Sequence, residues 1–180
     1  MQNINSRFIY NQKSHRLLGH DYDAAGIYFV TICIKNRRCQ FGQVVDDKVV
    51  LSELGQIAQN EWIKSVKIRP DMNLRSHGFI AMPDHIHGII EIGKNIHNQQ
   101  RRDAMHHVST DKGSFFPQKN NLSAIILGYK AAVTTYARKN AIVFAWQAKF
   151  HDHIIRSDQD LHKHHEYIRN NPKNWKGSNC

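Results

Sequence analysis

Hydrophobic residues recur along this chain with two periods, and the shorter period predicts strands. In a strand, successive side chains point to opposite faces, and β-branched and aromatic residues are favoured. The clearest example opens at a glycine and runs Gly-Ile-Tyr-Phe-Val-Thr-Ile-Cys-Ile. By these criteria, and with a hairpin turn at Asp46-Asp47, strands are predicted at 26–34, 41–45, 48–51, 74–80, 85–92 and 145–155.

The longer period, about 3.6 residues, predicts three helices. Ser52 is a suitable N-cap for the first helix, and either Asn121 or Ser123 for the second. Pro172 cannot continue a helix and therefore ends the third. The predicted helices cover 53–66, 122–140 and 158–171.

The order of these elements predicts an α+β fold. Hairpin corners are frequent and no regular strand-helix-strand alternation is present, so we expect an antiparallel β-sheet with helices packed on it. The chain has 180 residues, which is enough for one domain with its own core. We expect a basic N-terminal arm at 1–22, a single domain at 23–176 with a long flexible loop at 93–120, and a tail at 177–180.

Two histidines flank one isoleucine inside an apolar stretch that follows the Met82-Pro83-Asp84 corner. On a strand, His85 and His87 share one face while Ile86 points into the core. Two neutral imidazoles side by side form a bidentate metal site. The alternative is a pair of surface histidines, because the chain contains 13 of them. The apolar strand around the pair favours the metal site.

The last predicted helix carries a tyrosine and an asparagine one turn apart. Tyr167 and Asn171 are four residues apart and therefore lie on one helix face. A tyrosine hydroxyl can act as a nucleophile, and an asparagine oxygen is a suitable ligand beside two imidazoles. If this face meets the strand with the two histidines, a His-His-Asn site for Mg²⁺ or Mn²⁺ results. The same spacing recurs at Tyr136 and Asn140, so spacing alone does not choose between the two pairs.

The charge of the chain favours a polyanionic partner. Lysine and arginine total 25 against 15 aspartates and glutamates, which gives a net charge of +10. Such an excess favours nucleic acid first. For each basic residue, a solvated surface charge is the alternative to a phosphate contact. The candidate phosphate contacts are Lys35, Arg37, Arg38, Arg101, Arg102 and Arg156.

Hydropathy gives no indication of a membrane segment. No apolar run approaches the roughly 18 residues that cross a bilayer. The first residues also lack the apolar core of a signal peptide. We therefore expect a cytoplasmic protein without a membrane partner.

Several short motifs occur together in one order, beginning with the His-hydrophobic-His motif. The later motifs are Trp146-Gln147, His153-Ile154-Ile155-Arg156 and Tyr167-Ile168-Arg169-Asn170-Asn171-Pro172, and earlier ones lie at 28–33, 36–37, 41–42 and 54–55. In this combination the chain resembles the REP-associated tyrosine transposases, which belong to the wider single-tyrosine HUH transposases of bacterial insertion sequences. The resemblance spans roughly residues 20–176.

The resemblance implies a ferredoxin-like α+β fold and an enzyme that cleaves and rejoins single-stranded or hairpin DNA, such as repetitive extragenic palindromes. It implies that His85 and His87 are ligands of Mg²⁺ or Mn²⁺ and that Tyr167 is the nucleophile, which forms a 5′-phosphotyrosine link. Asn171 lies where the third ligand is expected, a place often taken by glutamine in the insertion-sequence relatives. His151 lies where relatives often have paired aromatic residues.

Two alternative functions stay open at this stage. A domesticated protein with this fold would bind single-stranded DNA or hairpins without productive strand transfer. A metal-dependent phosphodiesterase would use water in place of Tyr167 with the same metal ligands. The oligomeric state is equally open: we expect a monomer, and a homodimer is the alternative, because insertion-sequence relatives form dimers.

Overall fold

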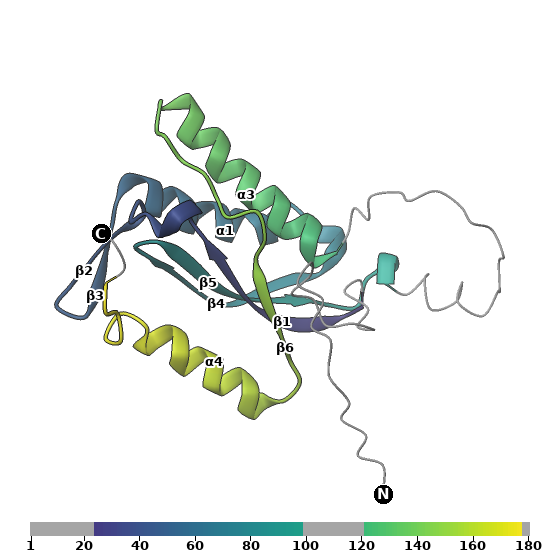
Figure 1. Cartoon of the computed structure of the whole chain (residues 1–180). Helices are drawn as coiled ribbons and strands as arrows, with labels where there is room; N and C mark the ends of the chain where they lie inside the picture. Colours follow the sequence, from purple (N-terminus) through teal and green to yellow (C-terminus); the bar gives the residue numbers. More distant parts are fainter. Residues whose placement is uncertain (1–23, 99–120, 178–180) are drawn as a thin grey trace, which may run out of the picture.

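A four-stranded antiparallel sheet forms the centre of the computed structural model, which describes residues 24–98 and 121–177 (Figure 1). Its strands lie in the order β4-β5-β1-β6, and every neighbouring pair is antiparallel. The strands are β1 (Gly26–Cys33), β4 (Leu74–Met82), β5 (His85–Ile92) and β6 (His151–Ile155). The predicted arm at 1–22 and most of the predicted loop at 93–120 lie outside the described residues.

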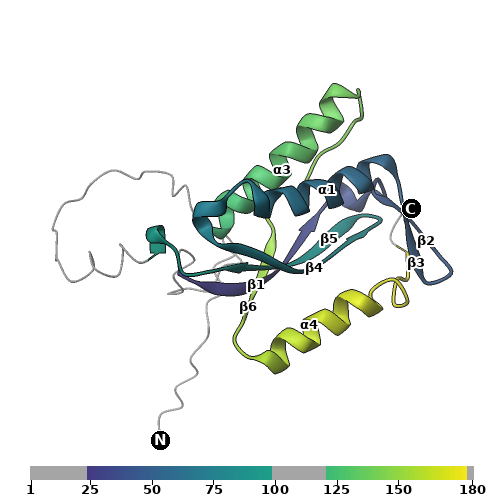
Figure 2. The ribbon, with the colours of Figure 1, turned by 180° about the vertical axis from the view of Figure 1, so that it is seen from behind.

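Three helices cover the two faces of this sheet, with α1 and α3 on one face and α4 on the other (Figures 1 and 2). Each begins at a side-chain N-cap that accepts a backbone N–H bond: Ser52, Asn121 and Ser157 respectively. The helices are α1 (Glu53–Lys67), α3 (Leu122–Lys139) and α4 (Asp158–Asn170). The order β1-α1-β4-β5-α3-β6 makes the fold ferredoxin-like, and the predicted α+β class is confirmed.

Smaller elements connect these parts. The predicted hairpin is confirmed as a separate two-stranded sheet of β2 (Gly42–Val45) and β3 (Lys48–Leu51). Its turn residues Asp46 and Asp47 both have positive φ, which matches the twist of a two-residue hairpin. Short 3₁₀ helices, η1 (Lys35–Arg37) and η2 (Pro70–Met72), follow β1 and precede β4.

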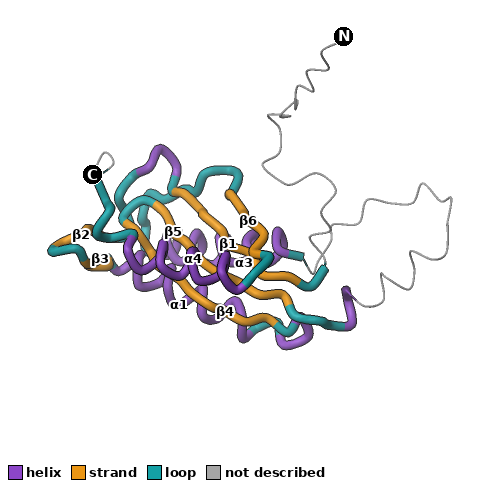
Figure 3. The backbone as a smooth tube through the Cα atoms, turned by 90° about the horizontal axis from the view of Figure 1, so that it is seen from below, coloured by secondary structure: helices purple, strands orange, loops and turns teal. Residues whose placement is uncertain are grey.

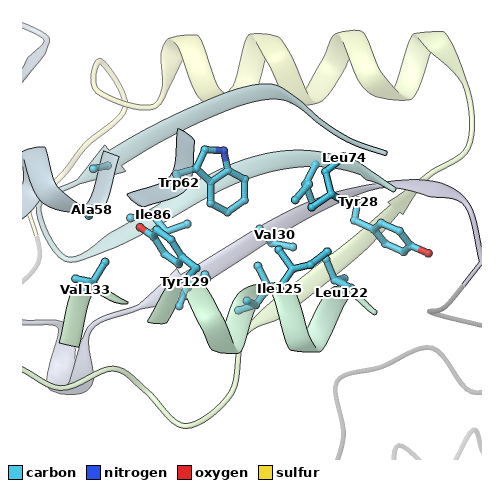
Figure 4. Packing of buried hydrophobic residues seen from close by; sticks show 14 of the residues in the cluster. Tyr28, Val30, Ala58, Trp62, Leu74, Ile86, Leu122, Ile125, Tyr129 and Val133 are labelled. Carbon is cyan, nitrogen blue, oxygen red and sulfur yellow. The ribbon is translucent and has the colours of Figure 1, made fainter. Parts of the chain in front are cut away.

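The even-numbered residues of β1 and β5 point toward α1 and α3 and form the main core (Figure 4). Alternation along a strand sends every second side chain to the same face, so these two strands supply a continuous apolar surface. Residues buried there include Tyr28, Val30, Ile32, Ile86, Ile90, Ala58, Trp62, Ile125, Tyr129 and Val133.

Gly88 belongs to the same inward-facing set and is a glycine for a packing reason. A Cβ atom at this position would lie 2.4 Å from the ring of Trp62, which is buried against the strand. The Trp62 indole N–H donates to Ser76 Oγ at 2.9 Å and is thereby fixed in place. Any side chain at residue 88 would displace this ring from the core.

The odd-numbered residues face α4, and the apolar cluster there is smaller. Its buried members are Ile89, Ile155 and Ile168, with Phe29 and Leu161 packed against them. Seen from below, α4 runs over the strands of the sheet (Figure 3). The rest of this face is therefore open to polar side chains.

The strand predicted at 145–155 is wrong in its first half, because β6 begins only at His151. Trp146 makes a single bridge with Ile34, and its indole N–H donates to the Lys130 carbonyl at 3.1 Å. The apolar residues of 142–150 pack on the edge of the main core, and no continuous ladder forms there. Their hydrophobicity reflects this covering role.

In the part of the chain that the structure describes, none of the helices combines the length and apolar composition needed to span a bilayer.

Candidate active site

His85 and His87 lie side by side on the α4 face of β5. Their even-numbered neighbour Ile86 is in the main core, as the alternation predicted. His85 is only 6% exposed and His87 only 4%, so both imidazoles are buried polar groups that need partners. The predicted common face is confirmed.

Each imidazole is held at Nδ1 by an oxygen of a neighbouring residue. His85 Nδ1 lies 2.5 Å from Asp84 Oδ1 and donates to this carboxylate. His87 Nδ1 lies 2.8 Å from Thr31 Oγ1, whose strand position is directly opposite in the ladder between β1 and β5. The two Nε2 atoms then face each other at 3.0 Å. A histidine that binds a metal through one ring nitrogen usually bonds to an oxygen through the other. Here Nδ1 has the oxygen partner, and Nε2 is the nitrogen left to face an ion.

Asp84 is fully buried and links the histidines to η1. Its Oδ2 lies 2.7 Å from Nε of Arg37, and its other oxygen accepts from His85. The backbone of Arg37 has φ +54°, in the left-handed region that a side chain other than glycine rarely occupies. This conformation brings the guanidinium back over the end of β1, where it also donates to Cys33 Sγ at 2.9 Å.

The electrostatic surroundings keep His87 neutral. Burial, with further contributions from the neighbouring His85 and Arg37, lowers the pKa of His87 from 6.5 to about 3. A neutral imidazole has a free lone pair, which is the form that binds a metal ion.

The α4 helix brings a tyrosine and an asparagine to the two histidines. The ring of Tyr167 lies 5.1 Å from the ring of His87 and 5.8 Å from that of Phe29, both nearly edge-on. Tyr167 is 50% exposed, so its hydroxyl is accessible to a large substrate, whereas Asn171 is buried. Beyond the helix, Trp175 places its ring 5.8 Å from that of His85.

These side chains line one cavity of about 400 Å³. Its wall is formed by Thr31, Arg37, His85, His87, His151, Tyr167, Asn171, Asn174 and Trp175. The cavity thus combines three imidazoles, two amides, the hydroxyl groups of Thr31 and Tyr167, one indole and one cation.

The donor set fits a divalent ion with oxygen and nitrogen ligands. Two ligand atoms at a right angle around an ion with bonds of about 2.1 Å lie about 3.0 Å apart, and the two Nε2 atoms have this separation. The side chain of Asn171 lines the same cavity and offers an amide oxygen as a third ligand.

The predicted phosphate contacts separate into different places. Arg37 lines the main cavity, whereas Lys35 and Arg38 line a second cavity of about 240 Å³ together with Val143 and Phe144. Arg156 follows β6 at the strand end opposite His151, and the structure does not bring it to the cavity. Arg101 and Arg102 lie outside the described residues.

The choice between the two tyrosine-asparagine pairs follows from their surroundings. Tyr136 lies on the other side of the sheet, packs against the main core, and donates its hydroxyl to the carboxylate of Glu53. It therefore takes no part in the cavity. Of the two tyrosines, Tyr167 lies on the side of the sheet that carries His85 and His87.

Sequence reasoning missed Thr31, Asp84 and Trp175 as members of this site. Asp84 precedes His85 directly in a tight corner, and this adjacency is a signal that could have identified it. Thr31 interrupts an apolar strand with a hydroxyl group, which is a weaker signal. Trp175 follows the last helix, and its place depends on how the chain continues after Pro172.

Comparison with known proteins starts from sequence. No protein-family model matches the chain. A protein of Haemophilus influenzae, described as an uncharacterized protein, is 33% identical over 171 residues, which are 93% of this chain and 91% of that protein. The chain belongs to the family of this Haemophilus protein.

Comparison of structures identifies the type of fold. The chain resembles the structure of a REP-associated tyrosine transposase bound to a REP hairpin, with a TM-score of 0.58 and 21% sequence identity. The match covers 88% of this chain and 73% of the transposase. The chain therefore has the fold of a REP-associated tyrosine transposase.

Proposed function

We propose that this protein is a metal-dependent transposase that cleaves and rejoins single-stranded or hairpin DNA through Tyr167. One observation carries this proposal: a half-exposed tyrosine ring lies 5.1 Å from His87 in a cavity where two imidazole Nε2 atoms are 3.0 Å apart. A nucleophile beside a bidentate metal site is the arrangement that phosphoryl transfer to a protein side chain needs.

The proposed cofactor is Mg²⁺ or Mn²⁺, with His85, His87 and Asn171 as its protein ligands. When bound, the ion supplies positive charge that polarises the scissile phosphate. Asp84 and Thr31 orient the two imidazoles through their Nδ1 atoms, and Arg37 adds a cation at the edge of the cavity. This cation would stabilise the negative charge that develops on the phosphorus oxygens.

In the proposed reaction, Tyr167 Oη attacks the phosphorus atom of one phosphodiester. The new Oη–P bond replaces the P–O3′ bond, so the products are a 5′-phosphotyrosine link and a free 3′-hydroxyl. The tyrosine proton is released to solvent, and the departing 3′ oxygen takes up a proton. The reverse reaction with another 3′-hydroxyl rejoins DNA, because the phosphotyrosine conserves one phosphodiester bond.

Three observations support the proposed substrate class: the net charge of the chain, an aromatic side chain at the cavity, and the hairpin bound to the transposase of the same fold. A net charge of +10 favours a polyanion, and Trp175 at the cavity wall offers a ring on which an unpaired base can stack. The transposase with the same fold was solved with a REP hairpin. We therefore propose hairpins with single-stranded flanks as substrates.

The test uses 3′-labelled and 5′-labelled hairpin DNA with Mn²⁺, analysed on a denaturing gel. Wild type, Tyr167→Phe and His85→Ala/His87→Ala are compared, and Tyr136→Phe is the matched tyrosine control. The expected result is a covalent protein–DNA band that carries the label of the 3′ fragment. It disappears in Tyr167→Phe and in the double variant and persists in Tyr136→Phe.

Two other outcomes would replace the proposal. Metal-dependent cleavage that survives in Tyr167→Phe, with no covalent band, would establish a phosphodiesterase that uses water. Tight hairpin binding without cleavage, across hairpins of several sequences and with either metal, would establish a DNA-binding protein without strand transfer.

A further inference from the structure

A second group of two imidazoles and a carboxylate lies outside the cavity, where β6 meets the first half of α4. His153 Nε2 lies 2.9 Å from Asp160 Oδ2, and His164 Nδ1 lies 3.2 Å from Asp160 Oδ1. The ligand atoms of all three residues lie within 4.8 Å of one another. None of the three lines the cavity of the candidate active site.

Two elements of the fold, β6 and α4, position the members of this group. The ladder pairs His153 with Phe29, an odd-numbered residue of β1, and so directs it to the α4 face. Asp160 and His164 are one helical turn apart and share a helix face. The backbone N–H of Asp160 donates to the N-cap Ser157 at 3.1 Å, which sets the position of its carboxylate.

Each imidazole nitrogen lies near one oxygen of the Asp160 carboxylate, at a separation close to that of two ligand atoms around a tetrahedral ion. With bonds of 2.0–2.1 Å, ligand atoms of tetrahedral zinc lie about 3.3 Å apart. The corresponding distances are 2.9 Å from His153 Nε2 to Asp160 Oδ2 and 3.2 Å from His164 Nδ1 to Asp160 Oδ1. The two imidazole rings stack with centroids 4.7 Å apart. His153 is the most exposed of the three, with 52% of its side chain accessible, and leaves a path for an ion.

We propose that His153, Asp160 and His164 bind a zinc-type divalent transition ion, with water in the fourth position. Two imidazoles and one carboxylate form the donor set of several zinc sites and differ from the oxygen-rich set that Mg²⁺ prefers. Without the ion, His164 Nδ1 is 2.8 Å from the Asp160 carbonyl, to which it donates. Binding requires its proton to move to the other ring nitrogen, a change of tautomer that neutral imidazole permits.

The ion would cross-link β6, through His153, to α4, the helix that carries Tyr167. The α4 helix packs on the sheet through a small apolar cluster. A metal cross-link would therefore add a large share to the stabilisation of this helix on the sheet. The ring of His164 lies 4.6 Å from that of Phe29, and Phe29 in turn contacts the rings of His87 and Tyr167. The consequence for the tyrosine rests on the proposed function, whereas ion binding itself does not.

The experiment titrates Zn²⁺, and Co²⁺ as a spectroscopic probe, into full-length His85→Ala/His87→Ala protein. This parent lacks the histidine pair of the candidate active site. In the parent background, His153→Ala and Asp160→Asn remove one ligand each, and His162→Ala is the matched control. His162 lies on the same helix with a 73% exposed side chain that pairs with Glu166.

The parent is expected to bind Zn²⁺, to show visible d–d absorption with Co²⁺ and to melt at a higher temperature with Zn²⁺. Loss of a single ligand is expected to weaken Zn²⁺ binding by at least about tenfold, since even loss of an outer hydrogen bond costs that much. His162→Ala should match the parent. The inference is overturned if the parent shows no Zn²⁺-dependent rise in melting temperature, or if folded His153→Ala and Asp160→Asn both bind as the parent does. Because this background lacks the proposed catalytic ligands, DNA cleavage by the wild type has no bearing on the result.

Discussion

The two faces of the central sheet are built from the same strands and differ in almost every other respect. From Tyr28 onward, the even-numbered residues of β1 and β5 are buried under α1 and α3, and all but Gly88 supply apolar side chains to the core. Odd-numbered residues of the same strands include Thr31, His85 and His87 and meet α4 across a cavity. Among the residues that the structure describes, a small cluster around Ile89 is the apolar core between α4 and the sheet.

Because of this difference, neighbouring residues of one strand serve different purposes: one contributes to the stability of the fold and the next to the candidate site. Burial of apolar side chains on the α1 and α3 face supplies most of the hydrophobic stabilisation. The α4 face can therefore hold buried polar groups with partners, such as Asp84 with Arg37 and His85. Substitutions of adjacent residues in a strand should therefore affect different quantities: one lowers the free energy of unfolding, and the next changes metal binding at the candidate site.

The largest effect is expected for Tyr167→Phe. Loss of the only hydroxyl proposed as nucleophile should lower the rate of strand cleavage by at least about 10³-fold. The free energy of unfolding should change by less than about 0.5 kcal/mol, because the side chain is half exposed. Single-turnover cleavage and urea unfolding measure the two quantities. A parallel loss of stability would assign Tyr167 to packing.

Ile86→Ala should have the next largest effect, on folding alone. This side chain is fully buried in the main core, and its truncation should lower the free energy of unfolding by about 2–5 kcal/mol. The adjacent His87→Ala should cost less stability and abolish Mn²⁺ binding. Urea unfolding and isothermal titration with Mn²⁺ distinguish the two variants, and equal losses of stability would break the proposed division between faces.

Thr31→Val should weaken Mn²⁺ binding by about 10–100-fold, because it removes the oxygen that orients His87 Nδ1 at 2.8 Å. The substitution keeps the shape of the side chain but leaves a buried imidazole nitrogen without its partner, so the free energy of unfolding should fall by about 1–3 kcal/mol. The neighbouring Val30→Ala, on the buried face, should lower stability and leave Mn²⁺ affinity at the wild-type value. Mn²⁺ binding that is unaffected in Thr31→Val would remove this residue from the site.

The smallest predicted effect is a dependence of stability on pH in metal-free protein. Because burial lowers the pKa of His87 to about 3, the unfolded chain binds one more proton than the folded chain at this residue between about pH 3 and 6.5. Stability should therefore fall as the pH falls below about 6.5, by up to roughly 1.4 kcal/mol per pH unit from this group.

Urea unfolding in EDTA at pH 7, 6 and 5 tests this slope. His87→Gln should reduce the loss of stability over this interval, and His162→Gln, at an exposed position, should not. Identical slopes for the wild type and His87→Gln would contradict the role of burial.

Much of this fold follows from the local pattern of the sequence. Strands β1, β4 and β5 and all three helices begin and end close to the predicted residues, because alternation, N-caps and Pro172 act locally. The common face of His85 and His87 follows from the same alternation. The metal role of this pair and of Asn171, and the role of Tyr167 as nucleophile, stay predictions.

Other features depend on contacts between distant parts of the chain. The stretch before His151 is apolar because it covers the main core. A strand could have the same composition, so the sequence alone does not distinguish the two structures. The bond from Thr31 to His87 depends on the register between β1 and β5. The group of His153 and His164 depends on where α4 crosses β6, so the histidines near 162–165 could not be assigned from their spacing alone.

The most direct test of a tyrosine nucleophile on the polar face is to identify the residue that becomes attached to DNA. Wild-type protein is incubated with hairpin DNA and Mn²⁺, digested with nuclease and protease, and analysed by tandem mass spectrometry. The expected result is a nucleotide linked through its 5′-phosphate to Tyr167. Attachment to another residue, or cleaved DNA with free 5′-phosphates and no modified peptide, would contradict this assignment.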